Sequence, residues 1–223
     1  MDWDERAEAS HRAESLSWAR KFNEAHGPTM AAWVSTFREN RPSEVVGDNC
    51  GSFNWSCQIR FDDGLQWMVR FAVPGRVMKP DEKVRREVAI MRFVEENTNI
   101  PVPAIIAWGT SEDNPLECGA FIIMEFVDGV PLDALLREDN ETEEPSVLRR
   151  DISDSELDNV YRQVAHVLLE LSAHDLSWIG SPPNRVGVAG TQPLTLKMNE
   201  IESHGGVDVG GMIFACFHAI ANL

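Results

Sequence analysis

Two apolar segments joined by a short turn place the strongest constraint on the fold of this chain. Residues 52–61 and 66–73 have the composition of β-strands, and Asp62-Asp63-Gly64 between them is typical of a hairpin turn. Successive side chains of a strand point to opposite faces, so the second segment has two distinct faces. One face carries Trp67, Val69, Phe71 and Val73, and the other carries Met68, Arg70 and Ala72.

Helices are predicted on both sides of this hairpin. We expect one helix over residues 2–26, ended by Gly27-Pro28, and a second over residues 30–39, closed by Pro42. A third helix is predicted after Pro80, with Asp81 as its cap, and it runs to about Asn97. One face of this third helix carries Val84, Glu87, Val88 and Met91.

The remaining signals place a strand over residues 121–127 and a helix after residue 153. Ile100-Pro101-Val102-Pro103 is extended, because each proline biases the preceding residue away from helix. Ser153 and Glu156 form a capping box, and apolar residues follow it at helical spacing up to Leu171. The order of elements predicts an α+β small lobe followed by the start of a helical lobe.

Composition and charge narrow the class of partner. The 223 residues carry a formal net charge of −16, which argues against nucleic acid or an anionic membrane as a partner. Nine acidic residues fall within 138–158, which predicts a solvated loop or, alternatively, an acidic rim that attracts a cationic substrate. No cysteines have CxxC spacing, the N-terminus does not resemble a signal peptide, and the apolar run 212–221 is too short for a membrane helix. We therefore expect a cytoplasmic protein.

Arg70 and Glu87 form the first candidate site. Arg70 is either an edge-strand residue with its guanidinium in water, or a phosphate-binding cation where kinases carry the lysine of strand three. Glu87 lies on the apolar face of the predicted helix, where a carboxylate needs a cation. It pairs either with Arg70 or, along its own helix, with Lys83 or Arg92. The order and spacing of the two residues favour the pairing of Arg70 with Glu87.

Two further segments have features of a nucleotide site. The small side chains of residues 49–54 would let phosphate oxygens approach backbone amides, and an ordinary β-turn is the alternative. The strand end over residues 121–127 offers backbone groups beside an apolar slot, as a purine ring requires, and a simple buried strand is the alternative. His174-Asp175 looks like part of a catalytic loop, but its position predicts a helix terminus.

Taken in order, these segments resemble the aminoglycoside phosphotransferase family, which shares the protein-kinase-like fold. The resemblance covers about residues 47–180, and its most specific pieces are residues 51–54, 67–71, 87–91, 100–103 and 121–129. It implies a small β-rich N-lobe with N-terminal helices and an incomplete helical C-lobe. We expect a helical extension over residues 1–44, the N-lobe over 45–128, and a partial C-lobe with an atypical tail over 129–223.

The resemblance implies that the chain binds ATP. The implied nucleotide-binding residues are Gly51, Ser52, Phe53, Arg70, Glu87, Met124, Glu125 and Val127. The first three would form the tip of the loop over the phosphates, and Arg70 would replace the usual lysine, with Glu87 as its partner. Met124 would be the gatekeeper beside adenine, and Glu125 and Val127 would offer backbone groups to adenine.

One departure from the family bears on activity. The catalytic loop of the family reads His-Gly-Asp followed by an asparagine, and a Mg²⁺-binding aspartate comes shortly after. After His204 this chain instead reads GGVDVGG, so no catalytic base and no metal ligand is assigned. We expect ATP-dependent transfer to a small-molecule hydroxyl as the family's activity, an inactive chain here, and an unidentified substrate. The alternatives are a pseudokinase-type binding or regulatory module and a truncated product without function.

Overall fold

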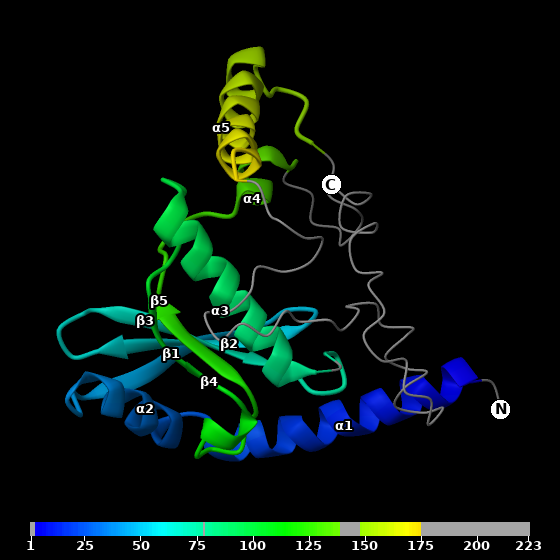
Figure 1. Ribbon diagram of the computed structural model, residues 1–223, viewed down its shortest axis with the longest axis vertical. Coiled ribbons are helices and arrows are strands. Elements are labelled where there is room, and N and C mark those ends of the chain that lie inside the picture. Colours follow the sequence, from blue (N-terminus) through cyan, green and yellow to red (C-terminus); the bar gives the residue numbers. More distant parts are fainter. Residues whose placement is uncertain (1–2, 78, 139–147, 175–223) are drawn as a thin grey trace.

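The fold is built on a five-stranded antiparallel sheet with the strand order β1-β2-β3-β5-β4. A computed structural model describes residues 3–77, 79–138 and 148–174 (Figure 1). The strands are β1 (Ser43–Cys50), β2 (Asn54–Phe61), β3 (Gln66–Ala72), β4 (Ile105–Gly109) and β5 (Phe121–Glu125). The helices are α1 (Trp3–Ala25), α2 (Pro28–Ser35), α3 (Pro80–Asn97), α4 (Leu132–Leu136) and α5 (Asp154–Ser172), with single 3-10 turns η1 (Thr36–Arg38) and η2 (Ser111–Asp113). This is the predicted α+β arrangement, and it is compatible with a kinase-like N-lobe.

Strand β3 lies in the middle of the sheet and has covered side chains on both faces. It pairs with β2 along one edge and with β5 along the other. As the alternation predicts, Trp67, Val69 and Phe71 are buried in one hydrophobic core. Ala72, with Met68 packed beside it, belongs to a second core. The period of two along this strand therefore separates the two cores of the protein.

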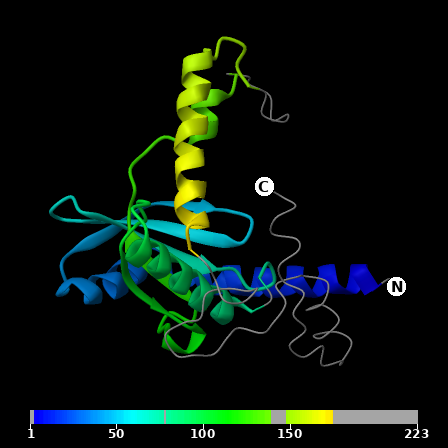
Figure 2. The same cartoon turned by 45° about the horizontal axis from the view of Figure 1, so that its top comes forward.

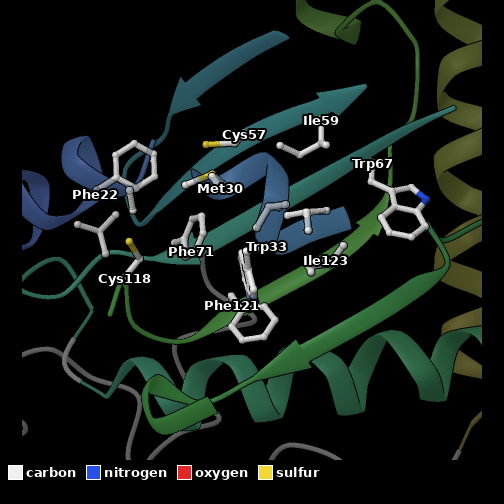
Figure 3. Packing of buried hydrophobic residues seen from close by; sticks show 14 of the residues in the cluster. Phe22, Met30, Trp33, Cys57, Ile59, Trp67, Phe71, Cys118, Phe121 and Ile123 are labelled. Carbon is white, nitrogen blue, oxygen red and sulfur yellow. The ribbon is translucent and has the colours of Figure 1, made fainter. Parts of the chain in front are cut away.

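The first core forms between the sheet and the two N-terminal helices. Phe22 of α1 and Trp33 of α2 both pack against Phe71 of β3, with ring centroids 5.8 and 6.3 Å apart (Figure 3). The indole N–H of Trp18 donates to the carbonyl of Cys118 at 2.8 Å, so α1 is fixed by a buried hydrogen bond as well as by packing. The N-terminal helices thus share the core of the sheet.

Helix α3 packs its apolar stripe in the second core, where Val84 and Val88 are buried as predicted. The helix begins with Pro80, whose fixed φ suits the first helical position, and no side chain caps it. The prediction that Asp81 caps the helix is therefore wrong. Its carboxylate instead accepts hydrogen bonds from the backbone N–H of Ser111 at 2.7 Å and from the Ser111 hydroxyl at 2.6 Å.

The alternation pattern does not predict the two edge strands. In β1 the register shifts between Val45 and Gly47, and in β4 it shifts between Ile105 and Ala107. A bulge of this kind breaks the period of two that marks a strand in the sequence. The inner strands β2, β3 and β5 end within two residues of their predicted limits.

The predicted N-terminal helices are confirmed with one difference. α1 covers almost all of the expected range, and α2 is followed directly by η1. The two together end at Arg38, one residue before the expected end at Glu39, because Glu39 and Asn40 have left-handed backbone conformations with φ of 50° and 58°.

Helix α5 begins as predicted and stands clear of the sheet in Figure 1, and Figure 2 shows the helix along its length. Both bonds of the capping box between Ser153 and Glu156 are present. The backbone N–H of Asn99 donates to the carboxylate of Glu170 at 2.8 Å, which joins the end of α3 to α5. Large apolar side chains of α5 are exposed, namely Tyr161, Val164, Leu168, Leu169 and Leu171.

Several features singled out in the sequence lie outside the described residues: Asp175, the stretch 205–211 and the apolar run 212–221. Part of the acidic segment, residues 139–147, lies outside them as well. Within the ranges that are described, no helix is both long and apolar enough to cross a membrane.

The packing of α1 predicts a large stability effect at one position of that helix. Phe22 is 1% exposed and Leu16 is 57% exposed. We expect Phe22→Ala to lower the free energy of unfolding by about 3–5 kcal/mol, because it empties a packed aromatic site. Leu16→Ala on the same helix should change it by less than about 0.5 kcal/mol. Denaturant unfolding followed by tryptophan fluorescence measures both. Equal losses for the two variants would contradict the packing described.

Candidate functional site

Arg70 projects from the centre of the sheet. Its strand β3 has neighbours on both edges, and Arg70 lies opposite Ser56 of β2 and Ile122 of β5. The interpretation of Arg70 as an edge-strand residue is therefore wrong. Its side chain is 25% exposed. A guanidinium with most of its surface covered needs a charged partner.

Glu87 of α3 is that partner. Arg70 Nη2 donates to Glu87 Oε1 in a direct ion pair. The second carboxylate oxygen, Oε2, accepts from Lys83 Nζ at 2.9 Å, one turn earlier on the same helix. Both pairings considered for Glu87 therefore exist at once, the one across to the sheet and the one along the helix. Two cations share one carboxylate, which leaves this group of three with a net positive charge.

Lys83 also joins the ion-pair group to the β1–β2 hairpin. Its ammonium donates to the side-chain carbonyl of Asn54 at 2.9 Å, and Asn54 is the first residue of β2. The sequence suggests Lys83 only as an alternative partner for Glu87. Helical spacing relates Lys83 to Glu87, but no sequence signal relates it to Asn54, 29 positions away.

One polar atom of Arg70 lacks a partner. Its Nε is buried and has no hydrogen bond. A guanidinium can donate two parallel hydrogen bonds to one carboxylate, but here the bond to Glu87 comes from Nη2 and not from Nε. A buried unpaired donor costs about 1–3 kcal/mol.

The hairpin loop over residues 51–53 is held at both ends. The N–H of Gly51 donates to the carbonyl of Asn54 at 2.9 Å, and the carbonyl of Phe53 accepts from the N–H of Val73 at 3.0 Å. Arg76, in the connection between β3 and α3, donates to the carbonyl of Gly51 at 2.9 Å. The loop itself is exposed, including the phenyl ring of Phe53. The loop is thus a short exposed turn with a cation bound to its backbone.

The end of β5 supplies the last group of predicted residues. Met124 is buried in the second core, directly opposite Met68 of β3. The N–H of Glu125 donates to the carbonyl of Ala104 at 2.9 Å, so this amide is already used within the protein. Val127 is exposed beyond the end of the strand. The backbone groups predicted to meet adenine are thereby narrowed to the Glu125 carbonyl and the backbone of Val127.

The structure brings several of the predicted residues to one region. Arg70 and Met124 project from the sheet toward α3, and Glu87 of α3 meets Arg70 there. The hairpin loop is joined to the same place through Asn54 and Lys83. Arg70, Glu87 and the end of the hairpin loop therefore meet at the N-terminal half of α3, whereas Glu125 and Val127 belong to the end of β5, beside Ala104.

Three other groups that could do chemistry, namely His174, Cys57 and Cys118, do not join this region. His174, at the end of α5, has its ring against Phe93 of α3 at 5.5 Å between centroids. Burial raises the pKa of the Cys57 thiol to about 12 and that of Cys118 to about 11, so neither is a nucleophile near neutral pH. In the part of the chain that the structure describes, no group of three or more His, Cys, Asp or Glu side chains could hold a metal ion.

The comparison with known families agrees with this geometry. Residues 54–187, more than half of the chain, match the model of the phosphotransferase enzyme family. The chain belongs to this family. The matched range contains Arg70, Lys83, Glu87 and the end of β5, and it begins just after the hairpin loop. No curated protein and no solved structure matches the chain.

Membership of this phosphotransferase family has general implications. Its members have kinase-like phosphotransferase activity and generally use ATP and Mg²⁺. The resemblance noted from the sequence is confirmed at the level of the family. The individual binding residues stay predictions.

The shared carboxylate of Glu87 predicts an unequal effect of removing its partners. Arg70→Ala leaves Glu87 paired with Lys83, whereas Glu87→Ala leaves two cations facing each other. We expect Glu87→Ala to lower the free energy of unfolding by about 1–3 kcal/mol, and Arg70→Ala to lower it by less. Chemical denaturation of the purified variants measures this order.

Glu44, which pairs with Arg60 between β1 and β2 at a more exposed position, provides the control. Glu44→Ala should change stability by less than about 0.5 kcal/mol. An Arg70→Ala variant less stable than Glu87→Ala would contradict the sharing of the carboxylate.

Proposed function

We propose that this chain is the ATP-binding part of a small-molecule phosphotransferase. The observation that carries the proposal is the Arg70–Glu87 ion pair, which joins a central strand to α3 in a member of the phosphotransferase family. Arg70 is carried by β3 and paired with a carboxylate of α3, so its charge is fixed in position before a ligand arrives. Fixed charge is what phosphate binding requires, since phosphoryl transfer depends mainly on positioning and on charge neutralisation.

The hairpin loop would cover the phosphates. An added Cβ at Gly51 would come no closer than 3.5 Å to another atom, the carbonyl oxygen of Asn54, which is an ordinary contact. The protein's own packing therefore does not demand glycine at this position. A glycine would instead serve a ligand, because its lack of a side chain lets phosphate oxygens approach the backbone amides of Ser52 and Phe53.

The end of β5 would bind the adenine ring. Met124, which is buried in the second core, would form an apolar wall, and the carbonyl of Glu125 and the backbone of Val127 would supply the hydrogen-bonding groups. A purine ring needs apolar walls with one or two well-placed polar groups. In the parent family, ATP would supply the γ-phosphoryl group for transfer to a small-molecule hydroxyl. We assign no residue to Mg²⁺.

We further propose that these 223 residues bind nucleotide without transferring phosphate. None of the six histidines in the sequence is followed two positions later by an aspartate, so the His-x-Asp pattern of the family's catalytic loop does not occur. The aspartate of that loop accepts the hydroxyl proton, and its asparagine holds a metal ion. The proposal assigns a helical extension to residues 1–44, an N-lobe to 45–128 and part of a C-lobe to 129–223. A pseudokinase-type module would have the same binding properties.

The proposal predicts nucleotide binding that depends on the Arg70–Glu87 pair. Titration with a fluorescent ATP analogue and Mg²⁺ should give saturable binding to the wild-type chain. The double variant Arg70→Ala, Glu87→Ala should bind at least about tenfold more weakly, a loss of about 1.4 kcal/mol, because the fixed phosphate-binding cation is gone. A coupled assay of ADP release with aminoglycosides and other small alcohols should give no turnover above the blank.

The matched control is the double variant Arg60→Ala, Glu44→Ala, which removes an ion pair of the same type between β1 and β2. It should bind the analogue as the wild type does. Equal loss of binding in both double variants would point to a general effect of charge or stability. If the wild type shows turnover and Arg70→Ala does not, the proposal that this chain transfers no phosphate is refuted.

A further inference from the structure

Lys83 occupies an electrostatically unfavourable place if its purpose is to stabilise α3. It is the fourth residue of the helix, close to the positive end of the helix dipole, where a cation is disfavoured. It also precedes Glu87 by four positions, and this order is weaker than the reverse order with the glutamate first. Stabilisation of the helix therefore does not explain the lysine.

The environment of Lys83 is that of a held cation. The side chain is 26% exposed, although it lies on a surface helix and is long enough to extend into water. Its ammonium is bound from two elements at 2.9 Å each, by the Asn54 side-chain carbonyl from β2 and by the Glu87 carboxylate from α3. These are its hydrogen bonds within the described residues. An ammonium has three donors, so one remains for a further acceptor.

The charge around Lys83 favours an anion. Glu87 carries one negative charge against the two positive charges of Arg70 and Lys83. Arg76 binds the carbonyl of Gly51 in the same hairpin whose far end, Asn54, binds Lys83. In a chain with a net charge of −16, this local excess of positive charge stands out from its surroundings. A partly covered excess charge of this kind attracts a counter-ion.

We propose that Lys83 is a phosphate-binding residue, and that it supplies from α3 the ammonium group that β3 lacks. Arg70 holds Glu87 in place, and Glu87 in turn holds Lys83. On binding, the remaining donor of the ammonium meets the phosphate oxygens of a nucleoside triphosphate, and the ion pair with Glu87 is kept. A lysine suits this role because it is a compact charge with three rotatable donors, whereas the guanidinium of Arg70 is a rigid fork. This inference rests on the proposed binding of ATP.

The test compares ligands with and without phosphates on the same variants. Isothermal titration measures the binding of ATP with Mg²⁺ and of adenosine to the wild type, Lys83→Met and Lys21→Met. Lys21 is a suitable control because it makes a single exposed ion pair, with Glu117 at 2.8 Å. Lys83→Met should weaken ATP binding at least about tenfold and leave adenosine binding unchanged, because only the phosphates meet the ammonium. Lys21→Met should match the wild type with both ligands.

A second measurement needs no substitution and remains valid if Lys83→Met does not fold. Acetylation of the wild-type chain, followed by mass spectrometry, gives the rate of modification at each lysine. ATP should slow the modification of Lys83 several-fold and leave Lys21 unaffected, and adenosine should protect neither.

The possible outcomes separate the two proposals. Saturable ATP binding with an unchanged affinity in Lys83→Met, or with no protection of Lys83 from acetylation, overturns the inference and leaves the proposed function standing. A wild-type chain that binds neither ATP nor adenosine contradicts the proposed function and the inference that rests on it.

Discussion

The carboxylate of Glu87 is the interaction on which the arrangement of the candidate site depends. Through this carboxylate, Arg70 joins the central strand β3 to α3. Lys83, paired with the same carboxylate, joins α3 to the β1–β2 hairpin at Asn54. Without the carboxylate, two cations would face each other in a partly covered space. With it, they are held in fixed positions and retain an excess positive charge. Such a group combines the stability of an ion pair with affinity for an anion.

The position of Glu87 depends in turn on the two cores on either side of β3. Apolar residues of α1 and α2 bury one face of the strand, and those of α3 bury the other. Arg70 lies on the second face, where a residue in the centre of a sheet has little freedom to move. The N-terminal helices pack on the face of the sheet opposite to the second core, and they restrain the strand that carries Arg70. The proposed site is thus supported by packing on the opposite face of the sheet.

Local patterns in the sequence predict the faces of β3 and of α3, because each depends on residues close together in the chain. The alternation along β3 assigns its two faces correctly, and the apolar stripe of α3 gives the surroundings of Glu87, so the pairing of Arg70 with Glu87 follows from the sequence. The edge strands β1 and β4 are not predicted, because bulges break their alternation and they are defined by pairing with distant strands. The use of the Glu125 amide by Ala104 depends on the lead-in to β4, so it was not predictable either. The contact of Lys83 with Asn54 joins residues 29 positions apart and needed the folded chain.

Hydrogen exchange measured by mass spectrometry, with and without ATP and Mg²⁺, tests most directly whether this group of charges and its hairpin form a nucleotide site. ATP bound as proposed contacts three separate segments: the loop at residues 49–56, the first half of α3, and the end of β5 at residues 122–128. We expect exchange to slow in these three segments together and to stay unchanged in α5 (Asp154–Ser172), which stands clear of the sheet. Exchange that is unchanged at saturating ATP, or that slows only in α5, would contradict the account.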